Sequence, residues 1–358
     1  MEYRTLGRSG LKVSVMALGT ANFGGAAADA RWGQLETPEA RRFVDIALEA
    51  GVNLFDTADV YSGGASEATL GEIVSGRRDE LLIATKVRFR SGPGPNDVGL
   101  SRHHIITSCE ASLRRLGTDW IDLYQVHEWD AMAPLEETLE ALDGLVRTGK
   151  VRYLGCSNYA AWQLMKALGI AERRGFDRFV SEQIYYSVLN REAEHELLPA
   201  SVEEGLGNLI WSPLAGGLLT GKYRRDAPAP PVGRHLSDWP EPPISDWEHV
   251  YDVIDAIVSV AEARGTTPAK VALSYSLATP GVTSVILGAR TEAQLTDTLA
   301  TPDVVLEREE RERLDRASAT PLPYPMWHQV LNTSDRMRPI DRWFAGLDRS
   351  SESDGAGH

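Results

Sequence analysis

Cysteines are few in this sequence, and acidic residues outnumber basic ones. The 358 residues include two cysteines, Cys109 and Cys156, so no framework of disulfide bonds holds the fold together. The formal net charge at pH 7 is -14. Because phosphate binding requires clustered lysine and arginine, we expect no nucleic-acid partner.

Long hydrophobic runs and metal-binding clusters are also missing from the sequence. No run of about 18 apolar residues occurs, and the N-terminal segment MEYRTLGRSGLKVS has no apolar stretch of the kind found in signal peptides. No group of cysteines and histidines has the spacing of a zinc site. We therefore expect a cytoplasmic protein with no membrane partner and no metal.

Short apolar runs alternate with amphipathic segments along the chain. In the amphipathic segments apolar residues recur at intervals of three and four, which predicts helices over residues 38–50, 103–116, 134–147 and 160–174. Strands that alternate with helices build parallel sheets from βαβ units. The expected fold class is α/β, and the expected strands fit a closed (β/α)8 TIM barrel. These strands span residues 15–18, 52–55, 81–85, 121–126, 151–155, 178–181, 208–211 and 284–287.

An open, doubly wound sheet is the main alternative to the barrel. When that fold binds a dinucleotide, a glycine-rich turn usually follows its first strand. Residues 24–28 are rich in glycine but lack the G-x-G-x-x-G spacing, and no helical pattern starts there. Before the first barrel strand, residues 3–6 and 11–15 flank a turn at 7–10 and predict a β-hairpin that caps the bottom of the barrel.

We interpret residues 1–348 as a single barrel domain. After the seventh strand, residues 214–247 form a long loop with several prolines, and loops of this length in compact domains usually carry function. A C-terminal extension follows the last barrel helix. Residues 349–358 are small and polar, so we expect a disordered tail there.

Polar side chains stand at the ends of successive expected strands. In a (β/α)8 barrel the carboxyl ends of all strands surround one pocket, so these side chains would meet. The set comprises Asp56, Lys86, His127, Ser157, Asn158 and Gln183, with Tyr61 in the loop after Asp56.

These residue types suit proton transfer to a carbonyl oxygen. Tyrosine has a reference pKa of ~10 and is a poor acid at neutral pH. The ammonium of Lys86 would lower the pKa of Tyr61, and Asp56 would anchor that ammonium. A neutral His127 would donate a hydrogen bond to the substrate carbonyl and orient it. The set contains no activated serine or cysteine nucleophile, which disfavours acyl transfer.

The chain resembles the aldo-keto reductase superfamily over roughly residues 1–318. The resemblance implies that Asp56, Tyr61, Lys86 and His127 form a catalytic tetrad with Tyr61 as the general acid. It also implies that a reduced nicotinamide dinucleotide supplies the hydride. The motifs that carry it are LGTANFG, NLFDTADVYS, ATK, ASLRRLGTDWIDLYQVH, GKVRYLGCSN, EQIYYS, WSPLAGGLLTGKY and GART.

By the same resemblance, several loops supply a cofactor site. Trp211 matches the aromatic position that stacks on the nicotinamide. Arg290 would pair with a 2′-phosphate, which favours NADPH/NADP+ over NADH. Thr298 departs from the family, which usually has asparagine there, so the contact with adenine is altered. The implied cofactor-binding residues are Gly19, Thr20, Asp56, Ser157, Asn158, Gln183, Trp211, Ser212, Pro213, Leu214, Gly216, Lys222, Gly288, Arg290, Gln294, Asp297 and Thr298.

Aromatic residues in the expected loops predict an apolar rim around the pocket. Such a rim suits a ring, sugar or aryl substrate, with simple packing as the alternative for each residue. We interpret Glu128 either as a pocket residue or as the partner of a loop cation, and Asp59 as a helix-entry or solvated acid. The expected substrate-binding residues are Phe23, Trp32, Tyr61, Phe89, His127 and Trp129, joined by Tyr324 and Trp327 of the C-terminal segment.

The expected activity is NADPH-dependent reduction of an aldehyde or ketone to an alcohol. The same residues would serve the oxidation of an alcohol or sugar, so the partner is a small carbonyl or alcohol compound. The other alternative is a cofactor-binding regulatory protein similar to the β subunits of potassium channels, which resemble this chain in the WSPL segment. Those subunits lack the catalytic histidine, whereas His127 is present here.

Overall fold

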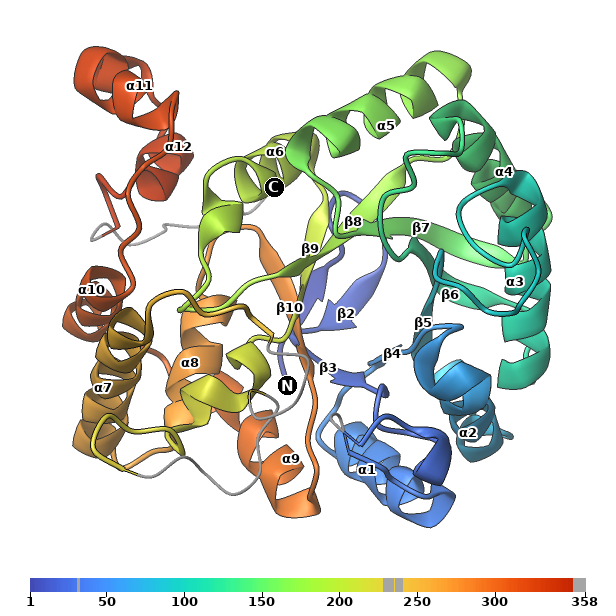
Figure 1. The fold of residues 1–358 in the computed structure, drawn as a ribbon, viewed down its shortest axis with the longest axis horizontal. Helices are drawn as coiled ribbons and strands as arrows, with labels where there is room; N and C mark the ends of the chain where they lie inside the picture. Colours follow the sequence, from blue (N-terminus) through green and yellow to red (C-terminus); the bar gives the residue numbers. More distant parts are fainter. Residues whose placement is uncertain (31–32, 228–234, 236–240, 350–358) are drawn as a thin grey trace.

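A closed barrel of parallel strands forms the centre of the molecule (Figure 1). The structure is a computed structural model that describes residues 1–30, 33–227, 235 and 241–349. The strands follow the cyclic order β10-β3-β4-β5-β6-β7-β8-β9, which confirms the predicted (β/α)8 TIM barrel and excludes the open sheet. They are β3 (Met16–Gly19), β4 (Leu54–Asp56), β5 (Leu82–Val87), β6 (Ile121–Val126), β7 (Val151–Ser157), β8 (Phe179–Tyr185), β9 (Gly207–Trp211) and β10 (Val282–Leu287).

The predicted N-terminal hairpin is present as β1 (Tyr3–Thr5) paired antiparallel with β2 (Lys12–Ser14). Leu6 and Val13 of this hairpin are buried with apolar residues that line the interior of the barrel, so the hairpin closes one end. Gly7 in its turn has φ 59, and a Cβ there would lie 2.5 Å from the carbonyl oxygen of Gly205. Only glycine fits this close approach.

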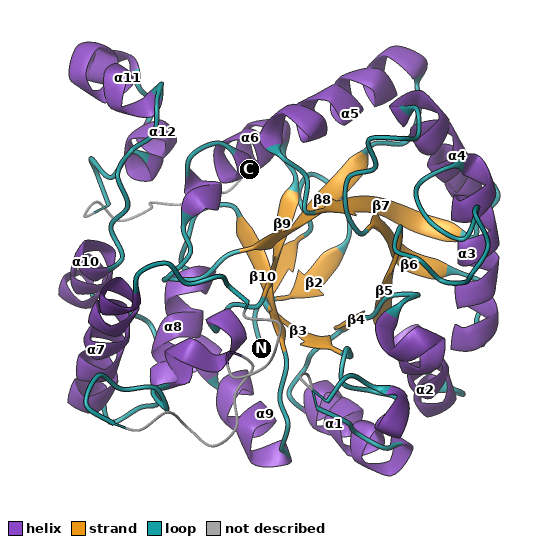
Figure 2. Cartoon of the chain, viewed as in Figure 1, coloured by secondary structure: helices purple, strands orange, loops and turns teal. Residues whose placement is uncertain are grey.

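Helices surround the barrel (Figure 2). The helix α3 begins after Ser101, whose side chain accepts a hydrogen bond from the His104 backbone, and ends at Gly117 in the left-handed conformation. Within the described ranges no helix is both long and apolar enough to cross a membrane. The helices are α1 (Thr37–Glu49), α2 (Ala65–Val74), α3 (Arg102–Leu116), α4 (Leu135–Arg147), α5 (Ala161–Arg174), α6 (Leu197–Glu204), α7 (Trp247–Arg264), α8 (Pro268–Leu277), α9 (Glu292–Leu299), α10 (Arg308–Ala317), α11 (Met326–Thr333) and α12 (Pro339–Phe344).

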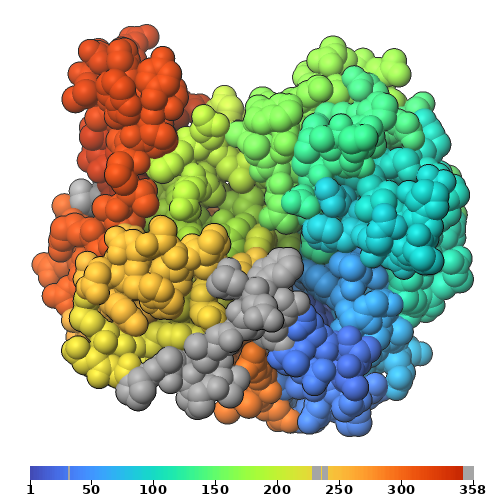
Figure 3. All heavy atoms as spheres, viewed as in Figure 1, coloured from blue at the N-terminus to red at the C-terminus, as the bar shows by residue number. Residues whose placement is uncertain are grey.

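The C-terminal extension stands at the edge of the molecule. Figures 1 and 3 show α11 as a projection beside α12, far from the centre of the barrel, and none of its residues is buried. Tyr324 is 73% exposed and Trp327 is 43% exposed. The prediction that these two side chains line the pocket is therefore wrong. The segment turns outward after α10 instead of folding back over the barrel.

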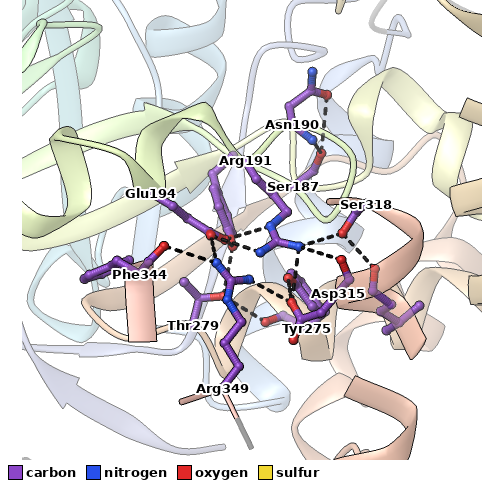
Figure 4. Close-up of polar contacts among 12 residues, drawn as sticks. Ser187, Asn190, Arg191, Glu194, Tyr275, Thr279, Asp315, Ser318, Phe344 and Arg349 are labelled. Carbon is purple, nitrogen blue, oxygen red and sulfur yellow. Dashed lines mark hydrogen bonds and ion pairs between the residues drawn. The ribbon is translucent and has the colours of Figure 1, made fainter. Parts of the chain in front are cut away.

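A buried cluster of charges fastens the end of the extension to the barrel (Figure 4). Glu194, which is 2% exposed, accepts hydrogen bonds from Arg191 and from Arg349. Asp315 lies 2.8 Å from Arg349 and 3.2 Å from Arg191. The two guanidinium groups balance the two carboxylates, which is the condition for burying them. Arg349 is thus held in place, whereas the rest of the predicted tail, residues 350–358, lies outside the described residues.

We expect Arg349→Ala to lower the free energy of unfolding by about 3 kcal/mol, because it leaves the buried carboxylates of Glu194 and Asp315 with one cation, Arg191, between them. Urea denaturation measures the change. The control is Arg338→Ala, which removes an arginine of the same extension that is 57% exposed and paired with Glu203. That loss should be about 1 kcal/mol or less. Equal losses in the two variants would contradict a structural role for the buried cluster.

Candidate active site

A buried lysine joins the acid and the phenol predicted for the catalytic group. Lys86, fully buried in β5, places Nζ 2.6 Å from Oδ1 of Asp56 at the end of β4. The same Nζ lies 3.3 Å from Oη of Tyr61 and donates to the carbonyl oxygen of Thr57 at 2.9 Å. Tyr61 begins the short 3-10 helix η2 (Tyr61–Gly64), directly after the turn that leaves β4. The structure therefore brings these three side chains together.

His127 follows β6 and faces the same group. Its ring lies 5.8 Å from the ring of Tyr61 and 4.7 Å from that of Phe89, edge to face in both cases. Burial lowers its pKa well below the usual range, and the cations Lys86 and Arg88 lower it further. The imidazole is therefore neutral at physiological pH, as predicted. Among the described residues its buried Nδ1 has no hydrogen-bond partner.

The pKa values of Tyr61 and Lys86 are both raised, but for different reasons. Burial raises the pKa of Tyr61 above its usual value, and the neighbouring Lys86 offsets only part of this increase. Lys86 thus acts in the predicted direction, but burial outweighs it, so the net shift of the Tyr61 pKa is upward. Burial acts to lower the pKa of Lys86, but Asp56 and Tyr61 raise it more, so the net direction is upward. Lys86 remains a cation at neutral pH.

The second oxygen of Asp56 is held by two amide side chains. Gln183 in β8 donates from Nε2 to Oδ2 of Asp56 at 2.8 Å, and Gln125 in β6 donates to the same oxygen at 3.3 Å. The sequence motifs predict a role for Gln183 but not for Gln125. The available signal was strand alternation, which puts Gln125 on the same face as Leu123 and His127 in IDLYQVH.

The candidate nicotinamide residues are linked to one another. Asn158 donates from Nδ2 to the carbonyl oxygen of His127 and accepts from Nε1 of Trp211, both at 3.0 Å. These bonds orient the indole, whose ring lies 4.7 Å from that of Tyr185. Ser157 donates to the backbone oxygen of Gln183 at 2.9 Å. Each amide and hydroxyl keeps further hydrogen-bonding capacity, as a carboxamide ligand would require.

Thr20 and Gly19 lie on the other side of this site. Gly19 ends β3, and the Thr20 hydroxyl donates to the backbone oxygen of Asp56 at 3.0 Å. A Cβ on Gly19 would lie 2.9 Å from Ile286 and 3.2 Å from the backbone of Leu287. Glycine thus lets β3 and β10 approach closely beside Asp56.

The loop after β9 has the backbone of an anion site. Residues 212–221 include Pro213 and Leu214, and positive φ angles occur at Ser212 (51), Ala215 (48), Gly216 (65), Gly217 (93) and Gly221 (80). Turns that combine right-handed and left-handed residues point successive N–H groups into a concavity that suits an anion. The Nζ of Lys222 lies 3.2 Å from the point that a Cβ on Gly217 would occupy, so the ammonium is close to this loop. The donor set fits a pyrophosphate.

The residues implied for the adenosine end gather around α9. Gly288 follows β10, and the backbone N–H of Arg290 donates to Oε1 of Gln294 at 3.0 Å. Asp297 is paired with Lys270 of α8 at 2.8 Å. The hydroxyl of the buried Thr298 donates to the backbone of its own helix, as the helix position of a threonine allows.

Phe89 and Trp129, two of the aromatic residues predicted for the substrate rim, lie on the loops after β5 and β6. The ring of Trp129 packs edge to face against Tyr159 at 5.3 Å and Trp162 at 5.5 Å. Glu128 lies 3.7 Å from Arg88, which decides in favour of its pairing with a loop cation. Phe23 is fully buried in the hydrophobic core, which favours the alternative of simple packing over the predicted substrate contact. Trp32, the remaining predicted rim residue, lies outside the described residues.

Asp59 is buried, so the solvated alternative of the two that we considered for it is wrong; it lies just before the short helix η2. It is 3% exposed, and neither carboxylate oxygen has a hydrogen-bond partner among the described residues. Burial raises its pKa to about 8, with a further increase from Glu67 and a partial decrease from Arg115. Asp59 is therefore mostly a neutral acid at neutral pH, two residues before Tyr61.

Comparison with known proteins places the whole barrel in one family. The model of the family described as Aldo/keto reductase family matches residues 15–319, from β3 through α10. A Bacillus subtilis (strain 168) protein named uncharacterized oxidoreductase YrpG is 42% identical over 322 residues, which cover 86% of this chain and 93% of that protein. A probable voltage-gated potassium channel subunit beta from Arabidopsis thaliana is 36% identical over 313 residues, which cover 85% of this chain and 92% of that protein.

We expect Asp59→Asn to stabilise the protein more as the pH rises. The unfolded carboxyl titrates near 3.8 and the folded one at about 8, so between these values only the folded state binds the proton. Wild-type stability therefore falls as the pH rises through this window, and the amide avoids the loss.

Urea denaturation at about pH 5 and about pH 9 measures the effect, and the gain in unfolding free energy should grow by about 2 kcal/mol or more. Asp119→Asn, the same change at an exposed site, is the control. A gain for Asp59→Asn that does not depend on pH would refute the buried neutral acid.

Proposed function

The chain belongs to the aldo/keto reductase family of oxidoreductases, and on this premise we propose that it reduces an aldehyde or ketone to an alcohol with NADPH. One observation carries the proposal. The buried ammonium of Lys86 contacts both Asp56 and Tyr61, and the neutral ring of His127 faces the same phenol. This arrangement serves proton delivery to a carbonyl oxygen as negative charge develops there.

Each of these side chains has a distinct role in the proposed reaction. Tyr61 donates its phenolic proton to the substrate oxygen, and Lys86 stabilises the phenolate that remains. Asp56 holds Lys86 in place. His127, neutral because it is buried beside two cations, donates a ring N–H to the carbonyl oxygen and orients it. When bound, the nicotinamide supplies the hydride.

The proposed cofactor path runs around the mouth of the barrel. Trp211, oriented by Asn158, offers a flat surface for the nicotinamide ring. The loop after β9 and Lys222 offer donors to the pyrophosphate. Arg290, next to α9, offers a guanidinium to a 2′-phosphate, which is the basis for proposing NADPH rather than NADH.

The proposed substrate is a carbonyl compound with an apolar ring. Phe89, on the loop after β5, lies beside His127, and Trp129 follows His127 by two residues on the loop after β6. Aromatic walls of this kind favour flat or apolar substrates. Oxidation of the corresponding alcohol uses the same residues in reverse, so the ratio of oxidised to reduced cofactor sets the direction.

A regulatory role is the second candidate, because relatives named as potassium channel β subunits match most of the chain. The Schizosaccharomyces pombe (strain 972 / ATCC 24843) relative, named as a putative one, is 36% identical over 306 residues, which cover 82% of this chain and 86% of that protein. The presence of His127 beside Tyr61 favours catalysis. Tight NADPH binding without oxidation by any aldehyde, diketone or keto-sugar would favour the regulatory role.

We expect Tyr61→Phe to lower kcat for carbonyl reduction at least about 100-fold, since the proton donor is lost. NADPH oxidation in a panel of aldehydes and ketones measures turnover, and fluorescence titration measures cofactor affinity. The affinity for NADPH should stay within about threefold of wild type, because the proposed contact of the Tyr61 hydroxyl is with the substrate and not with the cofactor. Tyr251→Phe on α7 is the matched control. Undiminished reduction by Tyr61→Phe would show that another group is the acid.

We expect Arg290→Ala to weaken NADPH binding by roughly tenfold or more and NADH binding much less, since only NADPH carries the 2′-phosphate. Titration of both cofactors with the wild type and the variant gives the four dissociation constants. Equal losses for the two cofactors would place Arg290 elsewhere in the site.

A further inference from the structure

Gln125 is a buried amide that the proposed reaction does not yet use. It lies in the interior of the barrel on β6 and has no exposed surface. The single hydrogen bond of its side chain among the described contacts runs from Nε2 to Oδ2 of Asp56 at 3.3 Å. Because a carboxylate only accepts hydrogen bonds, the amide nitrogen rather than the oxygen must face Asp56.

The other end of this amide is poorly satisfied. Its Oε1 is buried without a hydrogen-bond partner among the described residues. A buried carbonyl oxygen without a partner destabilises the folded state, and an apolar side chain of the same shape avoids that cost. Folding alone therefore does not explain a glutamine here, whereas donation to Asp56 does.

A neighbouring strand leaves room for Gln125. A Cβ on Gly155 of β7 would lie 3.0 Å from Cγ of Gln125 and 2.6 Å from Oγ of Ser181. The glycine thus creates the space in which the glutamine reaches across the barrel. Two strands, β6 and β7, contribute to this single contact with Asp56.

Gln125 and Gln183 hold the same oxygen from different sides. Gln183 is also matched to the carboxamide of the cofactor, so its amide serves two partners, whereas Gln125 is enclosed by the barrel and serves one. We propose that Gln125 is a positioning residue for the proposed reductase reaction, on which this inference rests. Its amide keeps Asp56 oriented so that Lys86 stays aligned with Tyr61.

The test variant is Gln125→Met, which preserves length and shape and removes the donor. We expect kcat to fall about tenfold, as for the loss of a hydrogen bond to a charged group, with the NADPH dissociation constant within about twofold of wild type. The melting temperature should change by no more than about 2 °C. Gln183→Met should weaken NADPH binding as well, which separates the two amides.

A second readout does not depend on turnover. The ammonium of Lys86 is buried and hydrogen-bonded, so its protons exchange slowly with water and give an ¹⁵Nζ NMR signal that Lys86→Met assigns. In Gln125→Met we expect these protons to exchange about tenfold faster, since Asp56 holds the lysine less firmly. Tyr124→Phe, on the opposite face of the same strand, is the control and should leave exchange and kcat unchanged.

The outcomes separate the alternatives. Unchanged exchange at Lys86 in Gln125→Met overturns the proposal, whatever the activity. A lower kcat accompanied by a marked drop in melting temperature, with unchanged exchange, shows that Gln125 is merely structural. If the wild type reduces no carbonyl compound, the proposed function fails, but the exchange rate at Lys86 still decides whether Gln125 orients Asp56.

Discussion

The ion pair between Lys86 and Asp56 is the interaction on which the site depends. A lysine with no exposed surface keeps its charge only if a carboxylate lies beside it, and here the distance is 2.6 Å. The remaining polar groups complete this pair. Thr57 accepts from the ammonium, while Gln183 and Gln125 donate to the free oxygen of the carboxylate. Tyr61 completes the set, with its Oη 3.3 Å from the ammonium.

A second set of buried charged side chains is next to the pair of Lys86 and Asp56. Glu67 is fully buried and accepts hydrogen bonds from Arg115 and from Thr85, the residue before Lys86. A third carboxylate nearby would leave an uncompensated negative charge, and Asp59 avoids this by keeping its proton. The same rule of charge balance governs the distant cluster that holds Arg349. In all these cases a buried ionisable side chain is either neutral or paired with an opposite charge.

Backbone strain is concentrated at the mouth of the barrel. Among the described residues, every non-glycine residue with positive φ follows a barrel strand: Ser62, Arg88, Asn158, Ser212 and Ala215. Such conformations cost of order 1–2 kcal/mol each and persist where the surrounding packing imposes them. The closed barrel and its helices provide that packing. It holds the loops with the candidate cofactor residues in these conformations.

The sequence by itself determined the barrel and the placement of most polar residues at the ends of its strands, because alternating apolar runs and the polar residue after each run are local patterns. It did not indicate α2, which is buried on most sides and so lacks an amphipathic period. Tertiary structure alone decided three further points: the burial of Asp59, the raised pKa of Tyr61 and the reach of Gln125 past Gly155. Each depends on desolvation or free space created by residues from several strands, which no single stretch of sequence contains.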